Sequence, residues 1–106
     1  MTARSVTDNA ERSRFELRVE GELVGWLDYR PAGESIILAH TEVMEGHEGE
    51  GLGGALVRAA LEAADAMRKT VIVTCPFAAA YIDRHPELDR FLAPHARRLP
   101  PAERGA

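Results

Sequence analysis

The succession of a strand, a glycine-rich loop, a helix and a second strand between residues 35 and 74 constrains the fold most. Residues 35–43 (SIILAHTEV) are rich in β-branched side chains and predict a strand. Residues 51–68 predict a helix, because apolar side chains recur there at spacings of three and four, namely Leu52, Leu56, Ala59, Ala60, Ala63 and Met67. The apolar run 70–74 (TVIVT) predicts a short strand that is buried on both faces. Strands joined by a helix pair in parallel, so this segment predicts a right-handed crossover unit.

The residues on either side of this unit predict a hairpin and further helices. Residues 14–19 alternate between apolar and charged side chains, as in a half-buried strand, and residues 23–30 predict the second strand of the hairpin. Residues 76–84 predict a helix, because Pro76 suits its first turn and Pro86 ends it. A short helix over residues 87–92 follows. The predicted fold class is therefore α/β, with a small mixed sheet of antiparallel N-terminal strands and one parallel crossover strand, and with two to three helices.

Length, charge and cysteine content exclude several classes of protein. A chain of 106 residues has room for one domain with a modest core. The net charge of -4 argues against a protein that binds nucleic acid by neutralising phosphates. The sequence has neither a long apolar run nor a signal-peptide pattern, so we expect a cytoplasmic protein that does not associate with a membrane. Cys75 is the single cysteine, which excludes an internal disulfide.

Composition divides the chain into three parts. Residues 1–13 are polar and lack periodicity, so we expect a flexible N-terminal arm. Residues 14–92 hold all the predicted strands and helices and form the predicted domain. Residues 93–106 carry three prolines and no apolar period, which predicts a flexible C-terminal tail. We expect such a protein to be a monomer or a weak homodimer.

Residues 48–54 (EGEGLGG) place four glycines in seven residues, directly before the predicted long helix. Each glycine costs a helix about 1 kcal/mol relative to alanine, so the cluster needs a physical reason. One reason is a tight strand-to-helix connection that needs positive φ and close packing. The other is an anion site, in which loop N–H groups and the helix N-terminus hold a phosphate. The position of the loop excludes a Rossmann motif, and the lack of a following Gly-Lys-Ser/Thr sequence excludes a P-loop.

Three motifs together resemble the GNAT N-acetyltransferases, and in particular their short single-domain branch. Residues 48–53 resemble the acetyl-CoA pyrophosphate loop of that family, with Gly51 and Gly53 at the family's glycine positions. Residues 40–43 (HTEV) and 75–81 (CPFAAAY) complete the pattern. The resemblance covers roughly residues 14–92, nearly all of the chain that we expect to be ordered. It implies a protein that binds acetyl-CoA and transfers the acetyl group to a primary amine of a small molecule or protein.

The resemblance also implies where acetyl-CoA would bind. In this fold two parallel strands splay apart beside the loop, and the exposed strand end bonds the pantetheine amides as an added strand would. The strand end, the loop and the helix N-terminus would then form the site. The predicted acetyl-CoA-binding residues are Val43, Met44, Gly49, Glu50, Gly51, Leu52, Gly53 and Gly54.

Four side chains are candidates for the chemistry. His40 and Glu42 stand two apart on one strand and share a face near the expected thioester, so either could take a proton from the acceptor ammonium. Their alternative roles are a hydrogen bond to a loop and a salt bridge. Cys75 precedes a helix N-terminus and is a candidate nucleophile or proton donor, or else a buried small hydrophobic residue. Tyr81 is a candidate general acid, or else an aromatic core residue.

Two departures from the family pattern keep other functions open. Glu48 occupies the position of the family's Gln or Arg, where a carboxylate repels a pyrophosphate by on the order of 1 kcal/mol. The chain also lacks the helices and the final strand pair that commonly shape the acceptor pocket. The alternatives are a non-catalytic acyl-CoA binding or sensing module, and an interaction protein that has lost the ligand. The sequence has no compact metal-ligand spacing, so we expect no metal site.

Overall fold

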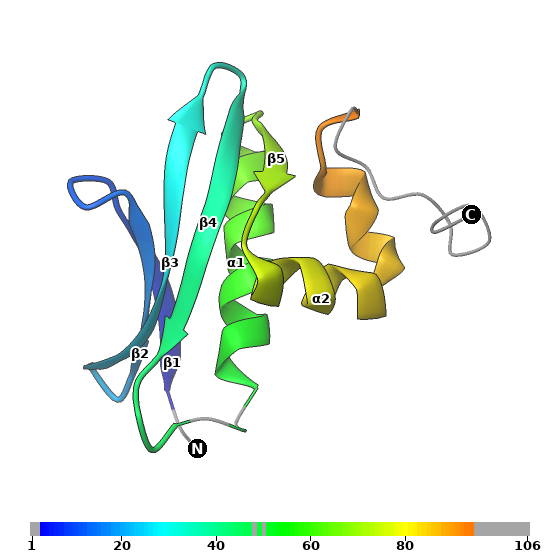
Figure 1. Ribbon diagram of the computed structural model, residues 1–106. Coiled ribbons are helices and arrows are strands. Elements are labelled where there is room, and N and C mark those ends of the chain that lie inside the picture. Colours follow the sequence, from blue (N-terminus) through cyan, green and yellow to red (C-terminus); the bar gives the residue numbers. More distant parts are fainter. Residues whose placement is uncertain (1–2, 48, 50, 95–106) are drawn as a thin grey trace.

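Five strands form one mixed sheet, and their order in the sheet follows the chain (Figure 1). The computed structural model describes residues 3–47, 49 and 51–94. Consecutive strands pair antiparallel up to β4, and β4 pairs parallel with β5 through the crossover helix α1. The strands are β1 (Arg4–Asn9), β2 (Arg14–Val19), β3 (Glu22–Ala32), β4 (Ser35–Val43) and β5 (Thr70–Val73), and the helices are α1 (Leu52–Ala66), α2 (Pro76–Arg84) and the 3-10 helix η1 (Pro86–Phe91). This architecture confirms the predicted α/β class.

The N-terminal segment differs from the flexible arm that the sequence predicts. Residues 4–9 form strand β1, which pairs with β2 along its whole length. The strand is also held by its side chains, because the Tyr29 hydroxyl donates a hydrogen bond of 2.6 Å to the carboxylate of Asp8. Most of β1 is exposed and only Val6 packs against the core, because β1 is the edge strand of the sheet. An edge strand with so little buried surface has no apolar alternation for sequence analysis to detect.

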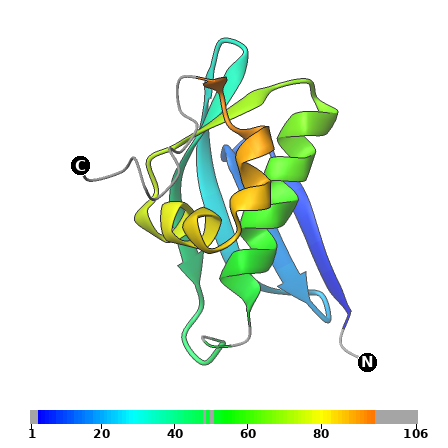
Figure 2. The same cartoon turned by 90° about the vertical axis from the view of Figure 1, so that its right-hand side faces the viewer.

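The helices all cover one face of the sheet (Figure 2). The core lies between them and the strands, and its largest fully buried side chains include Phe15, Leu17, Leu27, Leu38, Leu56 and Leu61. The buried stripe of α1 differs from the predicted one, because Met67 is exposed whereas Val57 and Ala64 are fully buried. Helix α1 contacts α2 and η1 as well as the sheet, so its buried stripe is wider than that of a helix packed on a sheet alone.

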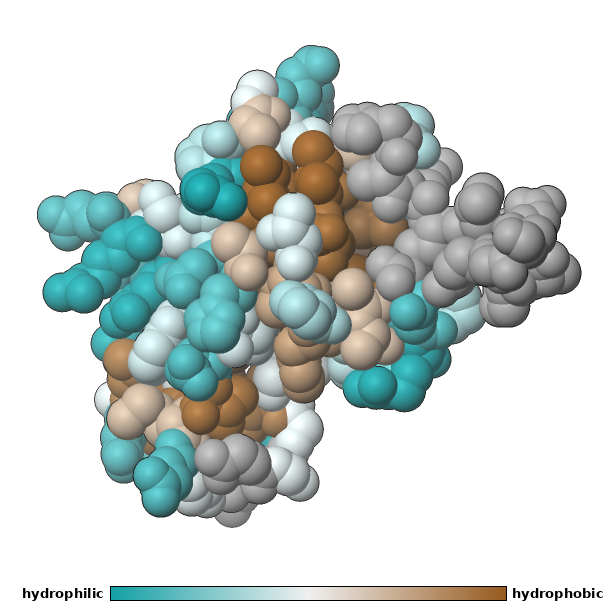
Figure 3. Space-filling view, viewed as in Figure 1, coloured by the Kyte–Doolittle hydropathy of each residue, from teal (hydrophilic) through white to brown (hydrophobic). Residues whose placement is uncertain are grey.

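The second sheet face carries no helix and is largely polar. Glu16 and Trp26 pair across β2 and β3 on this face, and Arg14 stacks over the Trp26 ring at 4.9 Å. Arg14 and Arg18 also form ion pairs with Glu16 at 2.8 and 3.0 Å. Hydrogen bonds from these arginines lower the pKa of Glu16 from 4.5 to about 2. Figure 3 shows hydrophilic surface on the left side of the molecule, with apolar surface over β4 and β5 and a second apolar area at the lower left.

Strand β5 is less buried than predicted. Only Val71 is fully buried, whereas Ile72 and Val73 are half-buried. The reason is position, because β5 is the last strand of the sheet. The chain after η1 covers its outer edge in part, since the Ala93 N–H donates to the Val71 carbonyl at 2.9 Å. Ala93, predicted as the start of the C-terminal tail, is therefore buried, while residues 95–106 lie outside the described residues.

Strands β4 and β5 part halfway along β4, and a bulge lies at the same place. Pairing between the two strands ends at Leu38 and Val73. On the other side of β4, Tyr29 pairs with Leu38 and Asp28 pairs with His40, which leaves one extra residue on β4 between them. A bulge of this kind bends a strand and turns the following side chains to the opposite face. The splayed strands place an opening in the sheet beyond Leu38.

Candidate active site

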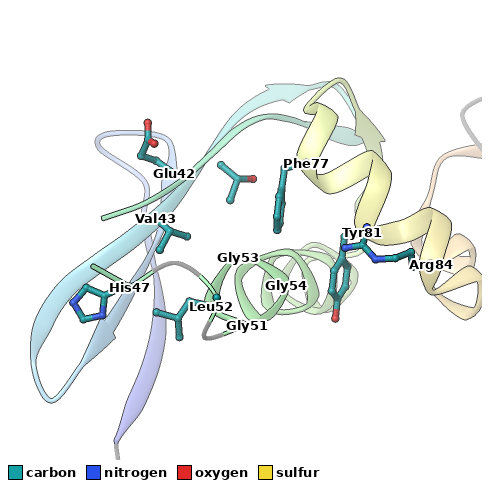
Figure 4. Close-up of a pocket in the computed structure, with 12 residues that line it drawn as sticks. Glu42, Val43, His47, Gly51, Leu52, Gly53, Gly54, Phe77, Tyr81 and Arg84 are labelled. Carbon is teal, nitrogen blue, oxygen red and sulfur yellow. The ribbon is translucent and has the colours of Figure 1, made fainter. Parts of the chain in front are cut away.

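A cavity of about 550 Å³ lies where β4 leaves β5 (Figure 4). The last residues of β4 form one wall, and α2 forms the opposite wall with Phe77, Tyr81 and Arg84. The glycine-rich loop and the first turn of α1 close the cavity between these walls. The described loop residues that line it include His47 and Gly49. The structure therefore brings the splayed strand, the loop and a helix N-terminus together, as the sequence predicts for an acyl-CoA site.

The N-terminus of α1 opens onto the cavity. Gly51 precedes the helix in the left-handed region, with φ of 75°, which glycine adopts more readily than any other residue. Gly51 as N-cap has no side chain with which to cap the helix, and the first N–H groups of any helix have no partner within it. Leu52, Gly53 and Gly54 belong to this first turn and line the cavity. Backbone amides at a helix N-terminus favour an anion, so this end of the cavity suits a phosphate.

Gly53 and Gly54 have a second role in helix packing. A Cβ atom on Gly53 would lie 2.5 Å from Cζ of Phe77, and one on Gly54 would lie 2.4 Å from Cε1 of Tyr81. Both distances are far below van der Waals contact. The Tyr81 ring is held by Arg58 and His85, so Gly54 allows α2 to approach α1 this closely, whereas the exposed Phe77 ring can turn away from Gly53. The structure therefore supports the first explanation of the glycine cluster: Gly51 provides the backbone turn and Gly54 the close packing of the cavity wall, while the anion site stays a prediction.

The backbone of β4 presents polar groups to the opening. The Met44 N–H donates to the Val24 carbonyl at 2.8 Å, so the Met44 amide belongs to the β3–β4 pairing. Backbone groups of successive residues in an antiparallel strand point alternately to its two edges. The N–H and C=O groups of Thr41 and Val43 are therefore directed away from β3, toward the opening. Of the two predicted strand-end residues, Val43 presents its backbone to the cavity and the Met44 amide does not.

His40 and Glu42 share a face, but it is the face without helices. Their side chains contact each other at 3.2 Å between Nε2 and Oε1, and both are more than half exposed. Figure 4 shows the Glu42 side chain pointing away from the cavity that its backbone lines. The bulge before His40 explains this placement, because it turns Thr41 and Val43 to the helix-covered face instead. The alternative of a mutual salt bridge therefore describes this pair, and the sheet opening separates it from the cavity.

Cys75 is buried, with 2% of its surface exposed, and it does not line the cavity. Its backbone N–H donates to the Leu38 carbonyl at 3.0 Å, and its Sγ accepts from the Ala78 N–H at 3.5 Å as the N-cap of α2. The Thr41 hydroxyl lies 3.3 Å from Sγ on the cavity side. These contacts favour the packing and capping role of Cys75 over its role as a nucleophile.

Tyr81 lines the cavity with its ring, and its hydroxyl is held elsewhere. Arg58 on α1 donates from Nε to the Tyr81 oxygen at 2.8 Å and forms an ion pair with Glu87 at 3.3 Å. The hydrogen bond with Tyr81 raises the pKa of Arg58. The His85 ring packs on the other side of Tyr81, with ring centroids 4.2 Å apart. These contacts fix the Tyr81 ring as part of the wall between α1 and α2.

Several cavity residues escape the sequence analysis. Thr41 is one, although the sequence carries a signal for it. Leu38 and Val43 are both apolar but five residues apart, and in a regular strand such residues lie on opposite faces, so a bulge between them is indicated. Phe77 and Arg84 are others, and they share a helix face with Tyr81 at spacings of four and three. Of the predicted loop residues, Glu50 lies outside the described residues, as does Glu48.

Two negative findings apply to the described part of the chain. Residues 3–47, 49 and 51–94 contain no group of three or more side chains placed to hold a metal ion. No helix within those ranges is long and apolar enough to cross a membrane.

Comparison with known proteins agrees with this geometry. Residues 14–91 match the sequence model of the family described as GCN5-related N-acetyl-transferase. The solution structure of a GCN5-like protein from Staphylococcus aureus is similar over 96% of each chain, with a TM-score of 0.67 and 19% identity. Ribosomal-protein-alanine N-acetyltransferase from Brucella melitensis biovar Abortus 2308 is similar over 76% of this chain and 60% of its own, with a TM-score of 0.50 and 22% identity. No curated protein matches the sequence. At these identities the two structures support the fold.

Proposed function

The chain belongs to the GCN5-related N-acetyltransferase family, and we propose that it binds acetyl-CoA and transfers the acetyl group to a primary amine. One observation carries the proposal: the same cavity holds a glycine-led helix N-terminus and the outward edge of a splayed strand. The first suits a pyrophosphate and the second suits the amides of a pantetheine arm.

Binding is assigned to backbone groups. The N–H groups of Leu52, Gly53 and Gly54, together with the loop at Gly49 and Gly51, would hold the pyrophosphate. The outward N–H and C=O groups of β4 would bond the pantetheine amides in the manner of an added strand. The thioester would then lie at the opening beyond the last β4–β5 pair, between the two faces of the sheet.

We assign acetyl transfer to the opening in the sheet, where β4 has separated from β5. The acceptor amine would approach from the face without helices, where Glu42 or His40 takes the ammonium proton directly or through a water. The amine nitrogen then attacks the thioester carbonyl, and the N–H of Thr41 or Val43 stabilises the oxyanion. As the C–S bond breaks and the CoA thiolate leaves, the nitrogen loses its second proton to water and becomes the neutral amide. A simple thiol has a pKa of about 8.5, so water, or Tyr81 after release from Arg58, suffices as the proton donor.

A second candidate is the binding of acyl-CoA without transfer. It is favoured by the mutual hydrogen bond of His40 and Glu42 on an exposed surface, and by the burial of Cys75. In this alternative the cavity binds the ligand, and no side chain is positioned to activate an acceptor. Turnover with a primary amine separates the two candidates.

Calorimetric titration with acetyl-CoA tests the proposal. We expect binding of about -7 to -8 kcal/mol, in the low-to-mid micromolar range. Gly51→Asp places a carboxylate at the helix N-terminus, and Gly51→Asn adds the same bulk without charge, since both side chains tolerate the left-handed region. The Asp variant should bind much more weakly than the Asn variant. Equal affinities, or no heat with the native chain, would contradict the proposed pyrophosphate site.

Release of free thiol from acetyl-CoA in the presence of primary amines then tests transfer. We expect turnover with at least one class of amine, and we expect Glu42→Gln to slow turnover without weakening acetyl-CoA binding. Tight binding with no turnover across small amines, polyamines and peptide N-termini would favour the binding module instead.

A further inference from the structure

Arg84 is the one lysine or arginine among the described residues that line the cavity. The sequence surrounds the loop with Glu45, Glu48 and Glu50, so a ligand with several phosphates requires a compensating cation nearby. Figure 4 shows the Arg84 side chain reaching from α2 back toward the Tyr81 ring. No described side chain forms an ion pair or hydrogen bond with the Arg84 guanidinium. It is an exposed cation, without a partner in the described structure, at the wall of a phosphate-binding cavity.

The position of Arg84 on α2 separates it from the α1 N-terminus. Phe77, Tyr81 and Arg84 follow one another at spacings of four and three and form one stripe along the helix. The first two rings lie against Gly53 and Gly54 at the beginning of α1. Arg84 is one further turn along α2, roughly 5 Å beyond Tyr81 at the rise of an α-helix. The α1 amides and the Arg84 guanidinium are therefore two sets of donors on two different helices, and both face the same cavity.

We propose that Arg84 binds the phosphate monoester on the ribose of CoA, and that the protein thereby distinguishes CoA from dephospho-CoA. This inference rests on the proposed function, because it assigns the pyrophosphate to the α1 amides. A terminal monoester is nearly dianionic at neutral pH, whereas each pyrophosphate group carries one negative charge. A guanidinium binds such a group through two parallel N–H donors.

Calorimetric titration of the full chain with CoA and with dephospho-CoA tests this assignment. The native protein should bind CoA about tenfold more tightly, the effect of one charge-assisted contact. Arg84→Gln should weaken CoA binding by the same factor and leave dephospho-CoA binding unchanged. Arg84→Lys, which keeps the charge but loses the paired donors, should retain part of the preference.

Arg30→Gln is the matched control for the lost charge. Arg30 is exposed at the far end of β3, pairs with Ile37 and does not line the cavity, so the variant should bind both ligands as the native protein does. Equal affinity of the native protein for CoA and dephospho-CoA would overturn the inference and leave the proposed function intact. An equal loss for both ligands in Arg84→Gln would also overturn it, by placing Arg84 on the pyrophosphate. Binding of neither ligand to the native protein would instead refute the proposed function.

Discussion

Replacing Gly54 with alanine tests whether the glycines of α1 are required for packing. The new Cβ would lie 2.4 Å from Cε1 and 3.0 Å from Cζ of Tyr81, a ring fixed by Arg58 and His85. Overpacking of this kind costs about 1–3 kcal/mol. Displacement of the ring also breaks the exposed hydrogen bond from Arg58. Against this, alanine favours the helix by about 1 kcal/mol. The net loss of stability is therefore about 1–2 kcal/mol.

Gly53→Ala is the matched control. Its Cβ would meet the far end of the Phe77 ring at 2.5 Å, but Phe77 is 43% exposed and free to turn toward solvent. The gain in helix propensity then offsets the adjustment, so its stability should stay within about 1 kcal/mol of the native protein. Thermal unfolding followed by circular dichroism measures both variants, with about 4 °C of Tm for each kcal/mol in a chain of this size.

A double variant shows whether the clash with Tyr81 is the cause. Tyr81→Ala removes the ring, so adding Gly54→Ala to it should restore rather than reduce stability, with a coupling energy of about 1–3 kcal/mol. If Gly54→Ala were as stable as Gly53→Ala, or if the two substitutions were additive, the packing argument would be wrong.

Three further predictions concern groups outside the cavity wall. The pKa of Glu16 in the folded protein is about 2, so its ionised carboxylate contributes fully to the free energy of unfolding above pH 4.5, and this contribution is lost as pH falls toward 2. Glu16→Gln should lower the free energy of unfolding by on the order of 3 kcal/mol at pH 7, and urea unfolding of the variant should depend less on pH over that acid range. Burial and the hydrogen bond to Asp8 raise the pKa of Tyr29 to about 12, so the protonated hydroxyl stabilises the fold up to about pH 10 and this stabilisation is lost as pH rises to 12. Tyr29→Phe should lower the free energy of unfolding by about 1.5–3 kcal/mol, and the absorbance of the phenolate should show that Tyr29 titrates late. Cys75→Ser keeps a side chain that can cap α2, so it should change the free energy of unfolding by about 1 kcal/mol and retain acetyl-CoA binding and turnover. If this variant bound acetyl-CoA but no longer turned over, the hypothesis that Cys75 is the nucleophile would be restored.

The crossover unit was predictable because its signals are local and independent. The long helix, the apolar strand after it and the glycines between them each follow from spacing or backbone chemistry, and together they allow one topology. Strand β1 was not predictable, because the pairing of Arg4–Asn9 with β2 depends on a partner along an exposed edge. A polar edge strand and a flexible arm have the same composition.

The site was predictable in outline and not in the direction of its side chains. A single extra residue between Leu38 and His40 reverses which side chains face the cavity. Thr41 therefore lies there, whereas the side chains of His40 and Glu42 point to the other face and Glu42 lines the cavity with its backbone alone. Periodicity assigns faces only within an unbroken strand, and a bulge shifts the assignment for every later residue. The tertiary contacts of Tyr81 with Arg58 and His85 likewise depend on helix packing that no local pattern encodes.

The central claim is that the α1 N-terminus and the outward edge of β4 bind one acetyl-CoA molecule. The most direct measurement is a titration of the isotopically labelled protein with acetyl-CoA, followed by the NMR shifts of backbone amides. We predict saturable shifts that are largest for Leu52, Gly53, Thr41 and Val43, with little change at Glu16 on the face without helices. Absence of saturation at millimolar ligand, or shifts that leave the α1 and β4 amides unmoved, would contradict the claim.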